Sequence, residues 1–390
     1  MNSRQKFLSV MNFEKNAVIP KTEFAYWAGT IRDWFNQGLP KVKDIPENIL
    51  NSESVRGSKP LSPEYSDEVD HNVAQYFNLD SYLEKFPIDY SPMLKSGIIE
   101  ENEEYRIFTD KYGLTNKVLK KKSSTPMVID YPIKNKNDFY NYISLYDNSS
   151  KGILKRLPQD FDRLSSDLKD RDFPIRLGGN PFGFSFLARH LMGEVTFMLS
   201  MYDDPDMLKE FNEYYLKLTK DYWSAILDKI EIDCIFILED IAYRSGSFIS
   251  KQMFDTFMKP YYVKLIDFLK QYRVQNIFVD CDGLIDELIP LWIDAGVTGL
   301  FPFEAVNDIV QIRQNYPKLK MMGGFNKKAL FASSSRQDID SELDRVFKVM
   351  KTGGYIPHID HAVSEDVTWD NFKYYREKLD SLIDRISVLG

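Results

Sequence analysis

The chain of 390 residues is poor in cysteine, has no excess of positive charge and contains no long apolar run. Its two cysteines, Cys234 and Cys281, are too few for a secreted disulfide framework, so we expect a cytoplasmic protein. A net charge of −8 argues against nucleic-acid binding, which requires a basic surface. No stretch approaches the roughly 18 apolar residues of a membrane span, so no membrane association is expected.

A dinucleotide-binding fingerprint is also missing, because no Gly-x-Gly-x-x-Gly opens a helix after a strand. The second half of the chain instead alternates short apolar runs with amphipathic segments. The runs lie at 174–179, 234–238, 276–279, 299–303, 319–324 and 354–357, and the amphipathic segments at 206–230, 250–273, 284–295, 306–316 and 336–352. Continuous apolar runs are typical of parallel strands that are covered on both faces.

Strand–helix repetition of this kind implies βαβ units. With an early strand at 18–24, it predicts an α/β fold, a (β/α)8 TIM barrel, with a doubly wound sheet as the alternative. Residues 36–170 do not follow the alternation; they contain a polar stretch at 51–66 and a predicted β-hairpin of 105–109 against 117–119. We therefore predict one domain over residues 1–390, in which 36–170 form an N-terminal elaboration over the barrel mouth.

Two aspartates, Asp280 and Asp282, end the apolar run at 276–279. Residues i and i+2 point to the same side of a strand, so these side chains should converge. Ionised carboxylates at the end of a buried strand are costly unless they are paired or bound to a metal. The pair is therefore expected either to hold a cation or to serve acid–base chemistry.

Polar residues follow the other predicted strands as well, and in a parallel barrel this end carries the active site. They are Glu239 and Asp240, then Glu304, Asn326 and Lys327, and finally His358, Asp360 and His361. For Glu239 and Asp280 a function is favoured over helix capping, whereas for Glu304 both interpretations stay open. Arg176 is a candidate for binding an anionic substrate group. For Arg189 a surface ion pair is the preferred interpretation.

Two of the four histidines, His358 and His361, fall in one strand-end loop. Together with Asp280 and Asp282, His361 would suit a hard or borderline cation such as Zn²⁺ or Mn²⁺. The metal-free alternative uses the same residues as general acid and base, with pKa values separated by their mutual proximity.

Several of these segments resemble the uroporphyrinogen decarboxylase-like superfamily, which includes true decarboxylases and zinc- and corrinoid-dependent methyltransferases. They are Leu238-Glu239-Asp240-Ile241-Ala242-Tyr243, Asp280-Cys281-Asp282-Gly283, Pro302-Phe303-Glu304, and Gly353-Gly354-Tyr355-Ile356-Pro357 to Asp360-His361. The resemblance covers roughly residues 170–380 and implies a (β/α)8 barrel.

Two departures from the superfamily pattern favour its methyltransferase branch. The decarboxylases carry an Arg-Gln-Ala-Gly-Arg stretch that grips substrate carboxylates, but residues 24–32 read Phe-Ala-Tyr-Trp-Ala-Gly-Thr-Ile-Arg. The methyltransferases bind zinc through His-x-Cys-Gly and a later cysteine. Asp280-x-Asp282-Gly283 matches the first motif in spacing, and His361 falls about where the later cysteine would be. The resemblance thus implies a ligand set of harder donors.

The resulting hypothesis is transfer of a methyl group from a small O-methyl substrate to a corrinoid carried by a partner protein. Zinc or another divalent metal, or a carboxylic acid in its place, would polarise the leaving oxygen. The expected metal ligands are Asp280, Asp282 and His361; the catalytic residues Glu239, Asp280 and Asp282; and the substrate-binding residues Trp27, Arg176, Tyr243, Glu304 and His358. The alternatives are a metal-independent decarboxylase of a carboxylated substrate and a non-catalytic barrel that binds a tetrapyrrole or a partner protein.

Overall fold

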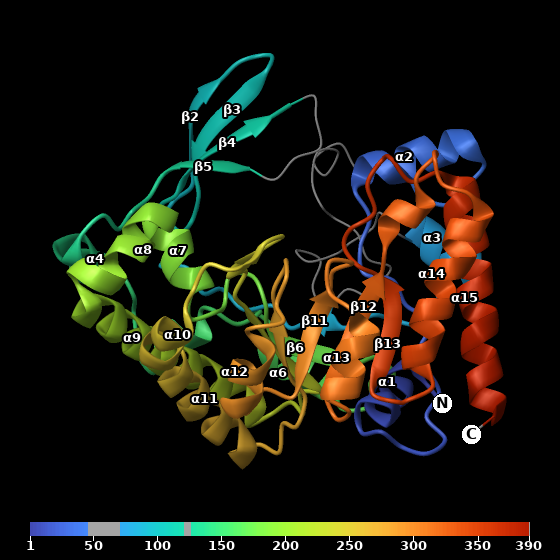
Figure 1. The fold of residues 1–390 in the computed structure, drawn as a ribbon. Coiled ribbons are helices and arrows are strands. Elements are labelled where there is room, and N and C mark those ends of the chain that lie inside the picture. Colours follow the sequence, from blue (N-terminus) through green and yellow to red (C-terminus); the bar gives the residue numbers. More distant parts are fainter. Residues whose placement is uncertain (46–70, 121–125, 390) are drawn as a thin grey trace.

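The computed structural model describes residues 1–45, 71–120 and 126–389 (Figure 1). The predicted polar stretch at 51–66 lies outside these residues. Seven strands form one curled parallel sheet, in the order β1-β6-β7-β10-β11-β12-β13. They are β1 (Glu84–Lys85), β6 (Ile175–Gly178), β7 (Cys234–Leu238), β10 (Ile277–Asp280), β11 (Gly299–Phe303), β12 (Lys320–Phe325) and β13 (Tyr355–Ile359).

The six strands expected from the apolar runs are all present, and they pair in parallel as neighbours. Every residue of β6, β7, β11 and β13 is buried, which is why these segments are apolar at successive positions rather than at alternate ones. Parallel pairing brings the carboxyl ends of β7, β10, β11, β12 and β13 to one edge of the sheet.

The early strand expected at 18–24 is wrong, because those residues adopt no regular structure. Pro20 has no N–H to donate to a strand ladder. The strand-like contact comes later, where Tyr26 forms an isolated parallel bridge with Val363. At the other edge of the sheet, the short β1 pairs with β6. The described chain therefore contains a curled seven-stranded sheet in place of the eight expected strands.

Helices follow most strands and cover the outside of the sheet (Figure 1). They are α9 (Pro205–Leu227), α10 (Lys251–Phe257), α11 (Lys259–Gln271), α12 (Ile289–Asp294), α13 (Ile309–Asn315), α14 (Arg336–Met350) and α15 (Trp369–Leu389), with α1 (Ser3–Met11) and α2 (Ala28–Gln37) near the N-terminus. The helix expected over 250–273 divides between α10 and α11, because Pro260 is confined to the first turn of a helix. None of the described helices is long and apolar enough to cross a bilayer.

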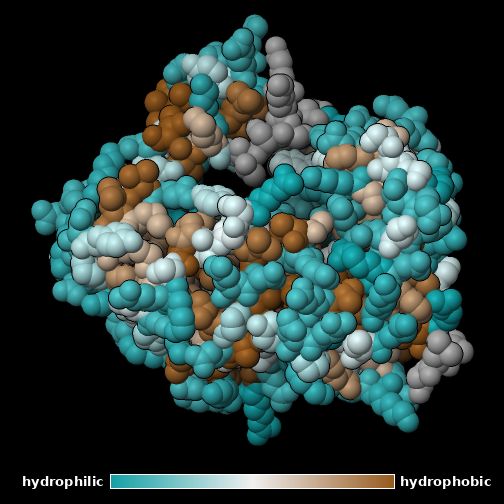
Figure 2. Space-filling view, in the orientation of Figure 1, coloured by the Kyte–Doolittle hydropathy of each residue, from teal (hydrophilic) through white to brown (hydrophobic). Residues whose placement is uncertain are grey.

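The predicted hairpin is confirmed as β3 (Tyr105–Thr109) against β4 (Thr115–Leu119). Two further strands, β2 (Gly97–Glu101) and β5 (Met127–Asp130), complete an antiparallel sheet of four. This small sheet stands away from the rest of the protein, on the side toward which the arrows of the parallel strands point (Figure 1). It exposes Ile98, Ile99 and Met127, and its surface is partly hydrophobic (Figure 2).

Three of the remaining helices link this small sheet to β6 of the parallel one: α4 (Lys136–Ile143), α5 (Ser150–Leu154) and α6 (Phe161–Asp167). Of the others, α3 (His71–Phe77) precedes β1, while α7 (Phe186–Met192) and α8 (Glu194–Asp203) follow β6. Tyr112, in the β3–β4 turn, places its ring 5.4 Å from that of His190 on α7. The elaboration therefore contacts a helix that starts at the carboxyl end of the parallel sheet.

Candidate active site at the carboxyl ends of the strands

Three side chains that follow different strands meet at the carboxyl edge of the sheet. The imidazole Nε2 of His361, after β13, lies 3.5 Å from the Oδ2 atom of Asp282, after β10. The backbone N–H of Asp282 donates to the Oδ1 atom of Asp240, after β7, at 3.2 Å. The side chain of Asp282 remains 42% exposed and that of His361 25% exposed, so the cluster is open to a ligand.

Asp240 is held in an unusual conformation and an unusual charge environment. Its φ of +44° lies in the left-handed region, which a residue with a side chain adopts rarely and at a cost. Burial and the nearby carboxylate of Asp282 raise the pKa of Asp240 to about 6, against the opposing effect of Arg189 and His361. Asp240 can therefore hold a proton near neutral pH and still release it, as a general acid must.

Arg189, on α7, faces the same cluster. Its Nη2 group donates to the backbone oxygen of Glu239 at 2.9 Å, and its positive charge lowers the pKa of Asp240. The surface ion pair expected for Arg189 is not formed with any residue that the structure describes. The reason is that its partner at the strand end is a backbone carbonyl, while rings surround the rest of the guanidinium.

Two acidic residues fix the loops around the cluster. Glu304 accepts the backbone N–H of Gly283 at 2.7 Å and so joins the loops that follow β11 and β10. Asp360 accepts the N–H groups of Ala305 and Lys327, both at 3.2 Å, and its pKa is raised by burial. These contacts restrain the strand ends that carry Asp282 and His361.

Glu239 is fully buried behind the cluster rather than exposed in it. Its carboxylate accepts the backbone N–H groups of Phe184 at 3.0 Å and Ser185 at 2.7 Å, and the hydroxyl of Tyr262 at 2.6 Å. Burial raises its pKa to about 7, although these hydrogen bonds favour the ionised form. The carboxylate lies at the start of α7, so this geometry gives Glu239 a positioning role for the helix that carries Arg189.

The expected metal ligands do not assemble as a set. Asp282 and His361 approach each other, and Asp280 ends β10 in a half-buried position. Across the described ranges, no three His, Cys, Asp or Glu side chains are arranged to hold a metal ion. The donor set thus does not fit a zinc site, and we derive no chemical step through a metal.

The expected substrate-binding residues are placed at different depths. Tyr243 is exposed, and its hydroxyl donates to Glu194. Trp27 is half-buried and starts α2. Arg176 is buried with its guanidinium 4.9 Å from the centroid of the Phe236 ring. His358 is fully buried among Phe24, Tyr82 and Phe301, with Nδ1 2.7 Å from the backbone oxygen of Ile359.

Sequence reasoning chose Glu239 as the acid of its segment and passed over Asp240. The signal it used was closeness to the apolar run, which selects the residue that is most buried. The positive φ of Asp240 directs this side chain toward Asp282, and no pattern in the sequence predicts that conformation.

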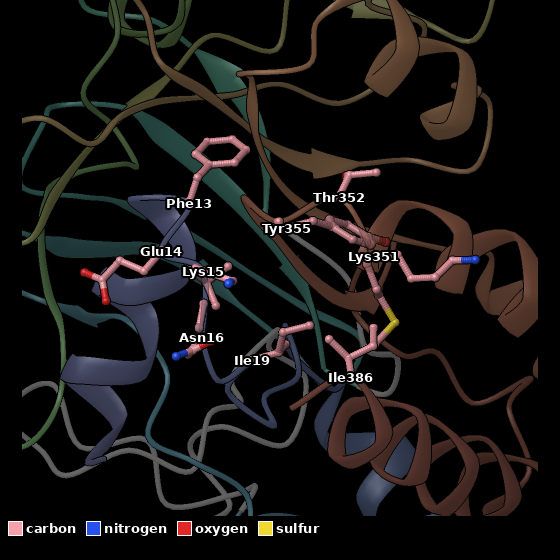
Figure 3. A pocket seen from close by; sticks show the side chains of 13 residues that line it. Phe13, Glu14, Lys15, Asn16, Ile19, Lys351, Thr352, Tyr355 and Ile386 are labelled. Atoms are coloured by element: carbon pink, nitrogen blue, oxygen red, sulfur yellow. The ribbon is translucent and has the colours of Figure 1, made fainter. Parts of the chain in front are cut away.

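A hollow of about 380 Å³ lies at the opposite end of the sheet, where β13 begins (Figure 3). Its lining includes Phe13 and Lys15 from the segment after α1, Lys351 from the segment after α14, and Tyr355 at the start of β13. Active sites of parallel barrels lie at the carboxyl ends of the strands. The cluster of Asp240, Asp282 and His361 is therefore the better candidate site.

One solved structure shares this architecture over almost the whole chain. A methyltransferase from Methanosarcina mazei superposes with a TM-score of 0.61 at 13% identity, covering 99% of both chains. A candidate vitamin-B12-independent methionine synthase from Listeria monocytogenes gives a TM-score of 0.32 at 11% identity, covering 59% of this chain and 67% of its own. No curated protein sequence matches the chain. A profile of the uroporphyrinogen decarboxylase (URO-D) family matches residues 112–381, more than half of the chain, and the protein therefore belongs to that family.

Proposed function

We propose that this protein is a methyltransferase that moves a methyl group from a small O-methyl substrate to a corrinoid carried by a partner protein. The observation that carries the proposal is the position of Asp240, whose carboxyl lies beside Asp282 with a pKa raised to about 6. An ether oxygen is a poor leaving group unless it is protonated, and Asp240 is an acid suited to that task.

In this mechanism the methyl carbon passes to the nucleophilic corrinoid, and the C–O bond breaks. The leaving oxygen keeps the bonding electron pair and takes the proton of Asp240. The imidazole of His361, 3.5 Å from Asp282, can relay a proton from solvent to restore the acid. Proton donation of this kind contributes roughly 10²- to 10⁴-fold to a rate.

Membership of the URO-D family and the likeness to a methyltransferase fold support the reaction class. The corrinoid acceptor rests on the resemblance of the strand-end motifs to corrinoid-dependent members of the superfamily. A partner protein would reach the cluster from the side of the small antiparallel sheet, where the space-filling view shows a hollow between that sheet and the rest of the protein (Figure 2).

We also propose that the parallel sheet closes into a full barrel through residues 21–27. The backbone oxygen of Lys21 accepts the N–H of Asp80 at 2.8 Å, just before β1. The backbone oxygen of Ala25 accepts the N–H of Val363 at 2.9 Å, just after β13. This segment thus bonds to the segments that flank the two edge strands, where an eighth strand would lie.

The test is methyl transfer to cob(I)alamin from a panel of methoxylated compounds. Transfer is measured by the change in absorbance as the corrinoid is methylated. We expect transfer by the purified protein and loss of transfer in Asp240→Asn. The proposal would be contradicted if no methyl ether were a donor, or if Asp240→Asn retained full activity.

A second candidate is the metal-independent decarboxylase. It is favoured by the matched family profile, because that family is described as uroporphyrinogen decarboxylase. Residues 24–32 contain one arginine, Arg32, and lack the Arg-Gln-Ala-Gly-Arg stretch with which the decarboxylases grip their substrates, and this makes the decarboxylase the weaker candidate. Release of CO₂ separates the two reactions, because methyl transfer produces none. CO₂ released in proportion to substrate consumed would favour the decarboxylase.

A further inference from the structure

Arg189 has donors that no described residue accepts. Within residues 1–45, 71–120 and 126–389, its one hydrogen bond runs from Nη2 to the backbone oxygen of Glu239, and Nε is buried without a hydrogen-bond partner. The side chain is half-buried and its positive charge acts on Asp240. A guanidinium that is partly removed from water and lacks a bonded anion is costly to hold, and an anionic ligand would offset that cost.

Aromatic rings surround this guanidinium. Its carbon lies 5.3 Å from the ring centroid of Phe248 and 5.7 Å from that of Phe186. The ring of Tyr243 lies 5.0 Å from that of Phe248 and is 53% exposed. An arginine beside an exposed aromatic face is suited to a planar ligand that carries a carboxylate.

Other cations near the strand ends are less suited to this role. Lys327 donates its ammonium group to the backbone oxygen of Ala362 at 3.2 Å. Arg176 is buried under Gly179, where a Cβ atom would meet its Nη1 at 2.3 Å. Arg189, by contrast, lies beside the rings of Phe248 and Phe186, and its charge also acts on Asp240.

We propose that Arg189 binds a carboxylate of the substrate, with Tyr243 and Phe248 forming the aromatic face beside it. The proposal rests on the proposed function and names its substrate class, a methyl ether that also carries a carboxylate. The carboxylate would anchor the substrate on α7, while the ether oxygen reaches Asp240.

The test compares binding of benzoate and benzamide, which have the same planar shape and differ in charge, by isothermal titration calorimetry. We expect the wild-type protein to prefer benzoate by about tenfold or more, and Arg189→Gln to lose that preference. Arg244→Gln is the matched control, because Arg244 is exposed and its replacement removes the same charge. Arg189→Lys should retain part of the preference and guards against a folding defect.

Three outcomes would overturn the proposal: equal binding of the two probes by the wild-type protein, an unchanged preference in Arg189→Gln, or equal losses in Arg189→Gln and Arg244→Gln. Binding requires no turnover, so the result is independent of the methyl-transfer assay. A benzoate preference that depends on Arg189, in a protein that transfers no methyl group, would uphold this inference and contradict the proposed function.

Discussion

The backbone N–H of Asp282 donates to the carboxylate of Asp240 at 3.2 Å, across the gap between the segments that follow β7 and β10. The contact brings two carboxyl groups together on adjacent strands, and like charges at close range favour the protonated form of one of them. An acid pair of the site is therefore formed between strands, by Asp240 and Asp282.

Replacement of Asp240 by asparagine should lower the rate of methyl transfer from an unactivated methyl ether by roughly 10²- to 10⁴-fold, because asparagine offers no proton of suitable acidity. A donor with a better leaving group, such as a nitrophenyl methyl ether, should be affected less. The rates are measured under single turnover by corrinoid absorbance. Asp286→Asn, at an exposed position, is the matched control and should retain the wild-type rate.

The pH dependence of methyl transfer should follow Asp240. The acid must be protonated, so the rate should decline as pH rises through about 6. The negative charge of Asp282 helps to raise this pKa, and Asp282→Asn should move the decline to lower pH while the backbone hydrogen bond remains. A pH–rate profile of the two proteins checks this, and identical profiles would exclude Asp240 as the acid.

Stability should depend on pH through Glu239. Its folded pKa of about 7 lies above its unfolded value, so the folded state binds a proton that the unfolded state has released. The free energy of unfolding should therefore fall as pH rises from about 4.5 through about 7, by a contribution on the order of 3 kcal/mol.

Glu239→Gln should lack this contribution, because glutamine does not ionise in this range. Urea unfolding of both proteins between pH 5 and 8 gives the difference, from which groups common to both cancel. Glu287→Gln, at an exposed position, is the control. Parallel stability profiles for the wild type and Glu239→Gln would contradict the assignment.

The strands could be predicted from the sequence because burial on both faces leaves a local mark. A run such as Cys234–Leu238 is apolar at every position, and its bounds match the observed β7. The segment at 18–24 misled the prediction, because its place in the fold depends on distant partners. Glu23, for example, bonds to Tyr375 and Arg376 on α15, far away in the sequence.

The candidate site was predictable in location but not in detail. Parallel topology brings residues after different strands to one edge, and Asp282 and His361 do meet there. The backbone conformation at Asp240 decides whether Glu239 or Asp240 faces the cluster, and this conformation could not be predicted from the sequence. The sequence also does not give the distances between side chains, which decide how many of them can bind one ligand. Arg189 was undervalued for a similar reason, since the rings that surround it come from two separate segments.

Glu23 and Arg376 form a buried ion pair, and removal of either partner should destabilise the fold because the other charge is left buried without its partner. Arg376 is fully buried and donates to Glu23 at 2.7 Å, to the backbone oxygen of Thr22 at 3.1 Å and to Asp380. Arg376→Met leaves buried carboxylates without their cation and should cost about 3–5 kcal/mol in the free energy of unfolding. Arg336→Met, which breaks a largely exposed pair with Asp370, should cost less than about 1 kcal/mol.

A double-mutant cycle of Glu23→Gln and Arg376→Met by urea unfolding measures the coupling. We expect the double variant to lose less stability than the sum of the single variants, by about 1–3 kcal/mol, because each single change leaves its partner buried and unsatisfied. Glu23 also accepts the N–H of Ile359 at 3.2 Å, two residues before His361. Arg376→Met should therefore slow methyl transfer under conditions where it remains folded, and additive stability losses with full activity would show that this pair does not position the strand end.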